Sequence, residues 1–89
     1  MGLPPALPLG YLSDMDHDAS LDALGLLCPL PVLKTAKQMR ALAQGEVLRV
    51  QTDDPAALID MPHYCAESGN ALLGQDEAGA VITWYLQKK

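Results

Sequence analysis

Cys28-Pro29-Leu30-Pro31 begins the clearest helix that this sequence predicts, over residues 29–44. Proline fits the first turn of a helix, where its missing N–H would have no partner, so we expect Cys28 to be the N-cap and Pro29 the first helical residue. An N-cap faces free backbone N–H groups and the positive end of the helix dipole, and both stabilise an anion. The position therefore predicts a thiol with a lowered pKa, and the thiolate is the reactive form of cysteine.

The rest of this segment has the spacing of a helix with one buried face. The apolar residues that recur at helical spacing are Val32, Ala36, Met39 and Ala43, with Leu33 beside them. Gly45 is a natural stop. Leu30, Lys34 and Lys37 fall on the opposite face, and we interpret them as candidate docking contacts for a partner protein. Packing of Leu30 on the preceding loop and solvation of the two lysines are the alternatives.

The remaining elements are shorter. Residue alternation and composition predict strands over 20–24, 46–52, 71–75 and 81–86, with a hairpin connection over 76–79. Asp54-Pro55 predicts an N-cap and the start of a turn over 55–60. Because Pro62 would break a continuous helix, we expect the second helix to begin near Pro62 and to end at Gly69.

The resulting order is β-α-β-α-β-β, which predicts an α+β fold. The simplest arrangement is a two-layer α/β sandwich, with a four-stranded mixed sheet and both helices on one face. Residues 19–89 are expected to form this single domain, and residues 1–18, which are rich in proline and show no regular period, a flexible N-terminal extension. The last strand has no plainly polar face, so either a partner covers the open side of the sheet or its Tyr and Thr side chains meet water.

The charge and the cysteine content narrow the function classes. A net charge of −5 argues against nucleic-acid binding, which needs clustered Lys and Arg, and favours docking onto a basic patch of another protein. The chain has two cysteines, no basic secretory signal and no apolar run long enough to span a membrane. We therefore expect a cytoplasmic protein with free thiols, and we predict no metal site and no cofactor.

Two motifs together resemble the TusA/SirA-like sulfur-carrier (sulfurtransferase) family. They are Asp22-x-x-Gly25-x-x-Cys28-Pro29-x-Pro31 and, after Asp54-Pro55, the segment Asp60-Met61-Pro62-x-x-Cys65-x-x-x-Gly69. The resemblance covers residues 20–87 and includes the order of helices and strands. It implies a persulfide carrier, which is an enzyme only in the limited sense of taking part in group transfer.

In such a relay the cysteine of the C-P-x-P motif, here Cys28, accepts a sulfane sulfur as a persulfide and passes it to another protein. The family implies a cysteine desulfurase or a rhodanese-like protein as donor. It also implies a downstream acceptor protein in tRNA thiolation, molybdenum-cofactor assembly or sulfur oxidation. The supporting residues are expected to shape the loop and the helix start, and they are Asp22, Gly25, Pro29 and Pro31.

Two other interpretations of the sequence stay open. The same fold could serve as a regulatory or protein-binding module that moves no sulfur. Alternatively, Cys28 and Cys65 could form a thiol redox switch, which requires their Cα atoms to lie within about 7 Å. For Cys65 itself we favour packing in the core, for His63 a surface position, and for Asp60 a cap of the second helix.

Overall fold

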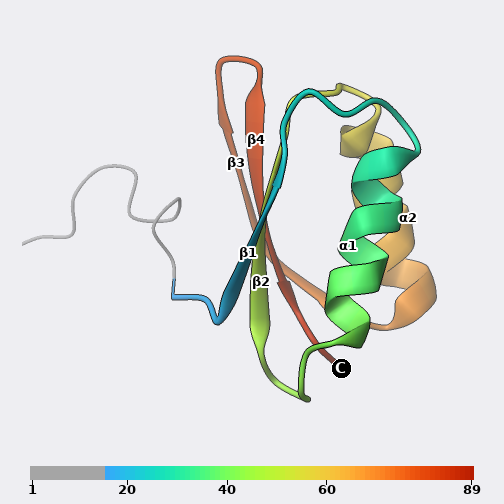
Figure 1. The fold of residues 1–89 in the computed structure, drawn as a ribbon, viewed down its shortest axis with the longest axis vertical. Coiled ribbons are helices and arrows are strands. Elements are labelled where there is room, and N and C mark those ends of the chain that lie inside the picture. The colour runs from blue at the N-terminus through green and yellow to red at the C-terminus, as the bar shows by residue number, and fades with distance from the viewer. Residues whose placement is uncertain (1–15) are drawn as a thin grey trace, which may run out of the picture.

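The computed structural model describes residues 16–89 and places two helices on one face of a four-stranded sheet (Figure 1). The elements are β1 (Ala19–Ala23), α1 (Leu30–Arg40), β2 (Val47–Thr52), α2 (Ala57–Ser68), β3 (Ala71–Ala78) and β4 (Val81–Gln87). The predicted α+β sandwich and its β-α-β-α-β-β order are confirmed. The predicted extension lies outside the described residues except for 16–18.

The strand order brings the two loops that precede the helices together. The sheet runs β1-β2-β4-β3, with β1 parallel to β2, and β4 antiparallel to both β2 and β3. Two neighbouring parallel strands end at the same edge of a sheet, and here Ala23 at the end of β1 pairs with Thr52 at the end of β2. The loop from β1 to α1 therefore runs beside the loop from β2 to α2.

The core lies between the helices and the sheet. Alternation along β2 puts Leu48 and Val50 inward. Trp84 of β4 is fully buried, and its Nε1–H donates to Thr52 Oγ1 at 2.9 Å. The other buried apolar residues of the core cluster are Ala23, Met39, Ala57, Met61, Cys65, Ile82 and Leu86.

The opposite side of β4 is also buried. Thr83 is 5% exposed and Tyr85 is 1% exposed. The Arg49 Nε–H donates to the Tyr85 hydroxyl at 3.3 Å, and Gln51 Nε2 donates to Thr83 Oγ1 at 3.5 Å across the paired strands. Thr83 and Tyr85 therefore do not lie open to water. This excludes the alternative from the sequence in which the Tyr and Thr side chains of the last strand meet solvent.

Helix α1 is shorter and begins later than predicted. Its N-cap is Pro29 rather than Cys28, and it ends at Arg40 rather than at residue 44. Cys28 therefore lies one position before the cap. A proline can hold this place because an N-cap residue needs no intrahelical donor.

The buried face of α1 is also rotated from the predicted one. The buried residues are Pro31, Thr35 and Met39, whereas Val32 and Ala36 are half-buried and Leu33 and Ala43 are exposed. Thr35 Oγ1 donates to the Pro31 carbonyl at 2.8 Å. Because this bond satisfies the buried hydroxyl, a polar residue can take a core position that hydrophobic spacing alone assigns to its neighbours.

The expectation for the second helix was wrong, because α2 is continuous through Pro62. The turn that leads into it begins on Asp54, whose carbonyl accepts the Ala57 N–H at 2.9 Å. Pro62 cannot donate to residue 58, but Leu58 is exposed, so solvent can reach this part of the helix. The helix ends where predicted, at Gly69, which adopts a left-handed φ of 83°.

Some strand ends also move. β1 runs over 19–23 rather than 20–24, and β3 continues to Ala78, where it pairs with Val81 and leaves a turn at 79–80 instead of 76–79. Gly79, with φ 62°, permits this tight turn. Asp18, which the sequence assigned to the extension, exchanges two 2.8 Å hydrogen bonds with Val47. Within residues 16–89, no helix is both long and apolar enough to cross a membrane.

Candidate functional site

Two aspartates hold the loop between β1 and α1, one near the end of β1 and one directly after β2. Asp22 Oδ1 accepts the Leu24 N–H at 2.9 Å, which closes the turn that the sequence expected of this residue. Gly25 adopts φ 78°, and its N–H donates to both oxygens of Asp53, at 2.9 and 3.1 Å. The loop is thereby fixed to the end of β2, in a conformation that favours glycine.

The backbone of Cys28 is bound to the second loop. Its N–H donates to Asp54 Oδ2 at 2.7 Å, and the other carboxylate oxygen of Asp54 accepts the Ala56 N–H at 3.2 Å. The peptide bond between Cys28 and Pro29 is cis. A single carboxylate therefore joins Cys28, which precedes the N-cap of α1, to Ala56, the N-cap of α2.

The thiol of Cys28 is exposed and has one acceptor. Its Sγ donates to Oδ2 of Asp60, in the first turn of α2, at 3.0 Å. This hydrogen bond raises the pKa of Cys28, and partial loss of water and the negative charges of Asp60 and Asp54 add to the effect. The predicted lowering of this pKa is therefore wrong. A carboxylate that accepts the S–H bond stabilises the protonated thiol.

A hollow of about 240 Å³ opens beside the thiol, between α1 and α2. Its walls are Cys28, Pro29 and Val32 on one side and Asp60, His63, Tyr64 and Glu67 on the other. His63 Nε2 lies 3.4 Å from Glu67 Oε1, and both side chains are largely exposed. The hollow is large enough for the sulfur of Cys28 to carry an added atom without displacing the helices.

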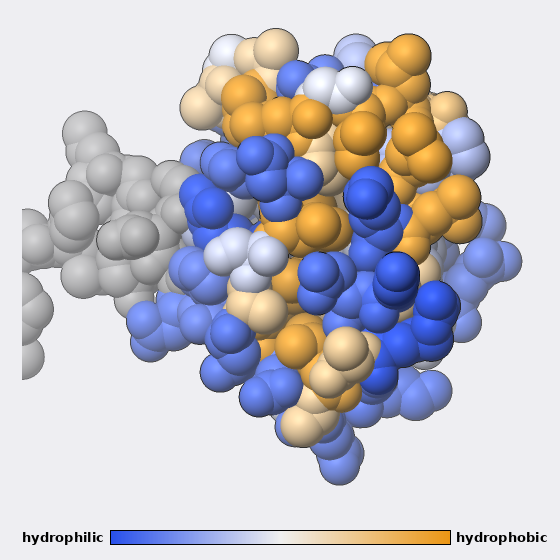
Figure 2. All heavy atoms as spheres, viewed as in Figure 1, coloured by the Kyte–Doolittle hydropathy of each residue, from blue (hydrophilic) through white to orange (hydrophobic). Residues whose placement is uncertain are grey.

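Apolar side chains gather around the same end of the molecule. Figure 2 shows hydrophobic surface at the top of the view, over the two loops and the helix starts. The exposed large apolar residues of these segments are Leu24, Leu27, Leu30, Leu33, Leu58 and Ile59. Among the described residues, the remaining exposed large apolar side chain is Leu73 of β3. Leu30, at 46% exposure, thus belongs to an apolar surface near the thiol, as a docking residue would.

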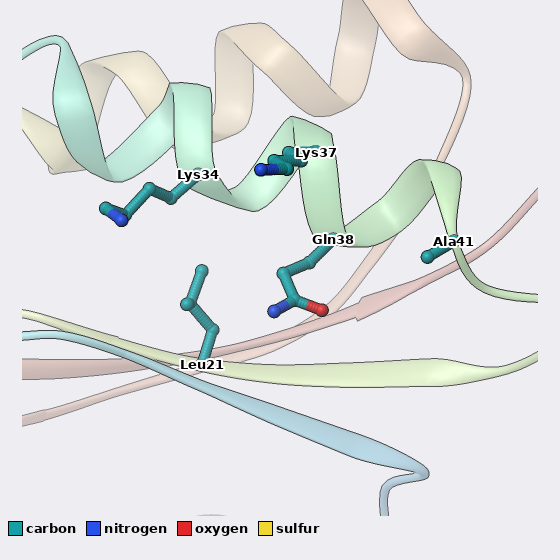
Figure 3. A pocket seen from close by; sticks show the side chains of 5 residues that line it. All are labelled: Leu21, Lys34, Lys37, Gln38 and Ala41. Atoms are coloured by element: carbon teal, nitrogen blue, oxygen red, sulfur yellow. The ribbon is translucent and has the colours of Figure 1, made fainter.

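Lys34 and Lys37 lie on a different surface. With Leu21, Gln38 and Ala41 they line a hollow of about 250 Å³ between α1 and β1, toward which Leu21 points (Figure 3). Neither lysine lines the hollow that contains Cys28. The structure therefore separates these two predicted docking residues from the thiol, while it keeps Asp22, Gly25, Pro29 and Pro31 in the segment that presents it.

Sequence reasoning missed the three carboxylates that hold this segment. Asp53 was assigned nothing, and Asp54 and Asp60 were interpreted only as helix caps. The adjacent acids after β2 were the available signal, because two carboxylates at a strand end can reach a neighbouring loop. The partner of the thiol could not be found in this way, since Cys28 and Asp60 are 32 positions apart.

The two cysteines occupy different environments and are both free. Cys65 is buried in the core, which raises the pKa of its thiol. It follows Asp60 by five residues, or roughly 140° around a helix, so it faces away from the carboxylate that binds Cys28. This geometry gives no support to the redox-switch interpretation.

Comparison with known proteins agrees with the resemblance. Residues 19–88 match the family model described as Sulfurtransferase TusA. The chain is 44% identical over 78 residues to the sulfur carrier protein TusA of Pseudomonas entomophila (strain L48), which covers 88% of this chain and 98% of the relative. It is 37% identical over 73 residues to TusA of Allochromatium vinosum, which covers 82% and 96%.

A solved structure has the same fold. The crystal structure of a SirA-like protein from Desulfitobacterium hafniense superposes with a TM-score of 0.70 at 24% identity, over 79% of this chain and 96% of that chain. It supports the two-layer arrangement, and the family match and the TusA relatives carry the assignment beyond the fold. From these similarities and the exposed thiol in the C-P-x-P segment, we conclude that the chain belongs to the TusA family of sulfur carriers.

Proposed function

We propose that this protein accepts a sulfane sulfur as a persulfide on Cys28 and passes it to an acceptor protein. The observation that carries the proposal is the exposed Cys28 thiol, presented by a hydrogen-bonded loop beside an open hollow. Cys65 offers no comparable position, because it is buried in the core. The names of the relatives, sulfur carrier protein, agree with this role.

The transfer needs no redox cofactor. In loading, the Cys28 sulfur attacks the terminal sulfur of a donor persulfide, and the donor's S–S bond breaks with its electron pair on the donor sulfur. A new S–S bond forms on Cys28, and the donor leaves as a thiol. In unloading, a thiolate of the acceptor protein attacks the outer sulfur of the Cys28 persulfide in the same way. Exposure of Cys28 serves both steps, since each requires a second protein to reach the sulfur.

The family resemblance supplies the classes of partner. A cysteine desulfurase or a rhodanese-like protein would load Cys28, and the acceptor would belong to tRNA thiolation, molybdenum-cofactor assembly or sulfur oxidation. Such a relay is expected in the cytoplasm. The apolar residues around the thiol, with Leu27 70% exposed and Leu30 46% exposed, would be covered when either protein docks.

Loading can be tested by intact mass spectrometry after incubation with a cysteine desulfurase and L-cysteine. Wild type and Cys65→Ser are expected to gain one sulfur atom that a reductant removes, and Cys28→Ser to gain none. The Cys65→Ser variant is the matched control, because it removes the other thiol by the same substitution. Equal loading of Cys28→Ser and wild type would contradict the proposal.

A further inference from the structure

The side chains that hydrogen-bond to Cys28 from the second loop and from α2 are both carboxylates. Asp60 accepts the S–H bond at 3.0 Å, and Asp54 accepts the backbone N–H of the same residue at 2.7 Å. The charged or titratable groups of α2 that line the adjoining hollow are Asp60, His63, Tyr64 and Glu67. Among the described residues, no Lys or Arg lines it. Lys34 and Lys37 of α1 line the other hollow, on the β1 side.

We propose that Asp60 holds Cys28 as a hydrogen-bonded, protonated thiol in the free protein, and that a cationic group of the docking donor protein releases the thiolate by pairing with the Asp60 carboxylate. The proposal rests on the carrier function proposed above and deepens it, because it names the chemistry of the donor surface. Asp60 is a positioning residue in this scheme, since it controls the thiol and does not touch the transferred sulfur.

The hydrogen bond from Cys28 Sγ to Asp60 Oδ2 requires a protonated thiol. An ionised carboxylate can only accept, so the proton between Sγ and Oδ2 must come from the thiol. If the thiol ionised while Asp60 stayed charged, two anions would lie 3.0 Å apart, and the Asp54 carboxylate is bound to the backbone N–H of the same cysteine. The free protein therefore favours the less reactive thiol, and the raised pKa of Cys28 agrees with this geometry.

Docking of a cationic group shifts the equilibrium of Cys28 from the thiol to the thiolate. A Lys or Arg of the partner that pairs with Asp60 removes the acceptor from the S–H group and places a positive charge beside the sulfur. The thiol proton then passes to water, and the thiolate attacks the terminal sulfur of the donor persulfide. The donor's S–S bond breaks with its electron pair on the donor cysteine, which takes up a proton from water. No oxidant or reductant is consumed.

The same charges would select among partners. A donor with a cationic surface around its persulfide gains attraction from Asp60, Asp54 and Glu67, whereas an acidic donor surface is repelled and leaves Cys28 protonated. The net charge of −5 acts in the same direction at longer range. The inferred donor therefore presents Lys or Arg next to its sulfur and apolar groups around them.

The first experiment measures how fast Cys28 reacts with iodoacetamide, a small uncharged reagent, as a function of pH. Asp60→Asn is nearly isosteric and should move the midpoint of the profile to lower pH. A midpoint lower by about one pH unit gives about tenfold more thiolate at pH 7 but makes that thiolate about threefold less nucleophilic, so the rate at pH 7 should rise about threefold. Glu67→Gln is the control, because it removes one negative charge from the same hollow without touching the thiol, and its profile should match wild type.

The second experiment tests release by a cation. Two cysteine peptides, one flanked by lysines and one by glutamates, are activated as mixed disulfides with thionitrobenzoate, whose release is coloured. Wild type is expected to react at least about tenfold faster with the lysine peptide at low salt, and Asp60→Asn to lose most of that preference. Glu67→Gln removes one attracting charge but leaves the acceptor of the S–H bond in place, so it should keep most of the preference.

Particular results would overturn the inference. Asp60→Asn could react with iodoacetamide as slowly as wild type or more slowly, or it could keep the full preference for the lysine peptide. If circular dichroism shows that Asp60→Asn is not folded, Asp60→Ala replaces it in both assays. Neither assay uses a persulfide, so their failure leaves the carrier function standing. Failure of Cys28 to load with sulfur would instead remove that function while these two results still hold.

Discussion

The pKa of both cysteine thiols is raised, but the cause differs between the exposed site and the core. Cys28 is exposed, and a neighbouring carboxylate stabilises its thiol through a hydrogen bond. Cys65 is stabilised as a thiol by burial. A hydrogen-bond partner can be taken over by an incoming group, whereas burial ends only when the core opens. The raised pKa is therefore a reversible restraint at Cys28 and a consequence of packing at Cys65.

The largest expected effect is in chemical labelling of the folded protein. Cys28 should react with iodoacetamide within the ordinary range of exposed thiols, while Cys65 should react at least about a thousandfold more slowly, because it must wait for the core to open. Peptide mapping after timed labelling measures both rates in one sample. Comparable rates for the two cysteines would remove the contrast between them.

Substitution by serine should affect stability at one cysteine and hardly at the other. In Cys65→Ser a more polar hydroxyl replaces a buried sulfur, which is expected to cost about 1–3 kcal/mol of the free energy of unfolding. Cys28→Ser lies at an exposed position and should stay within about 0.5 kcal/mol of wild type. Urea unfolding of both variants tests the difference. A larger loss for Cys28→Ser would mean that the thiol supports the fold.

A smaller effect is expected from the loop that presents Cys28. Gly25→Ala places a side chain at φ 78° with no atom within 4 Å of the new Cβ, so the cost is backbone strain of about 1 kcal/mol. Relief of that strain would weaken the bonds from Gly25 to Asp53 and shift Cys28 relative to Asp60. Urea unfolding measures the first consequence, and a changed labelling rate of Cys28 with Cys65 still protected measures the second. Unchanged stability and an unchanged labelling rate would show that the left-handed conformation of residue 25 is not needed to hold the loop or to position Cys28.

The smallest expected effect is on the pH dependence of stability. The folded-state pKa of Cys65 is raised above its unfolded value, so the unfolded chain releases this proton first as pH rises. The stabilisation is therefore full below the unfolded pKa, near pH 8.5, and is lost as the pH rises toward the folded pKa. Cys65→Ala should show a flatter decline in the urea midpoint between pH 8 and 10. If the urea midpoint of wild type fell with pH as gently as that of Cys65→Ala, the raised pKa of Cys65 would be contradicted.

The sequence predicted the architecture because its signals there are local. Alternation in β2, the glycine after α2 and the order of elements each depend on a few neighbouring residues. The position of Cys28 next to a helix start was also readable from the two prolines. The details that failed depend on packing: Thr35 occupies the core by bonding to the Pro31 carbonyl, and Pro62 sits inside α2.

The chemistry of the site was less predictable than its location. A thiol near a helix start suggests a lowered pKa, yet Asp60 from the second helix reverses the direction. That contact depends on the pairing of β1 with β2, which brings the two loops together. One sequence alone does not tell how far apart two helix starts will lie to within a hydrogen bond.

The assignment of Cys28 as the residue that carries sulfur is best tested by locating the sulfur in unmutated protein. The protein is loaded with a cysteine desulfurase and L-cysteine, its persulfide is blocked by alkylation, and its peptides are sequenced by tandem mass spectrometry. We expect the additional sulfur on the peptide that contains Cys28 and none on the peptide that contains Cys65. Sulfur found mainly on Cys65 would contradict the assignment.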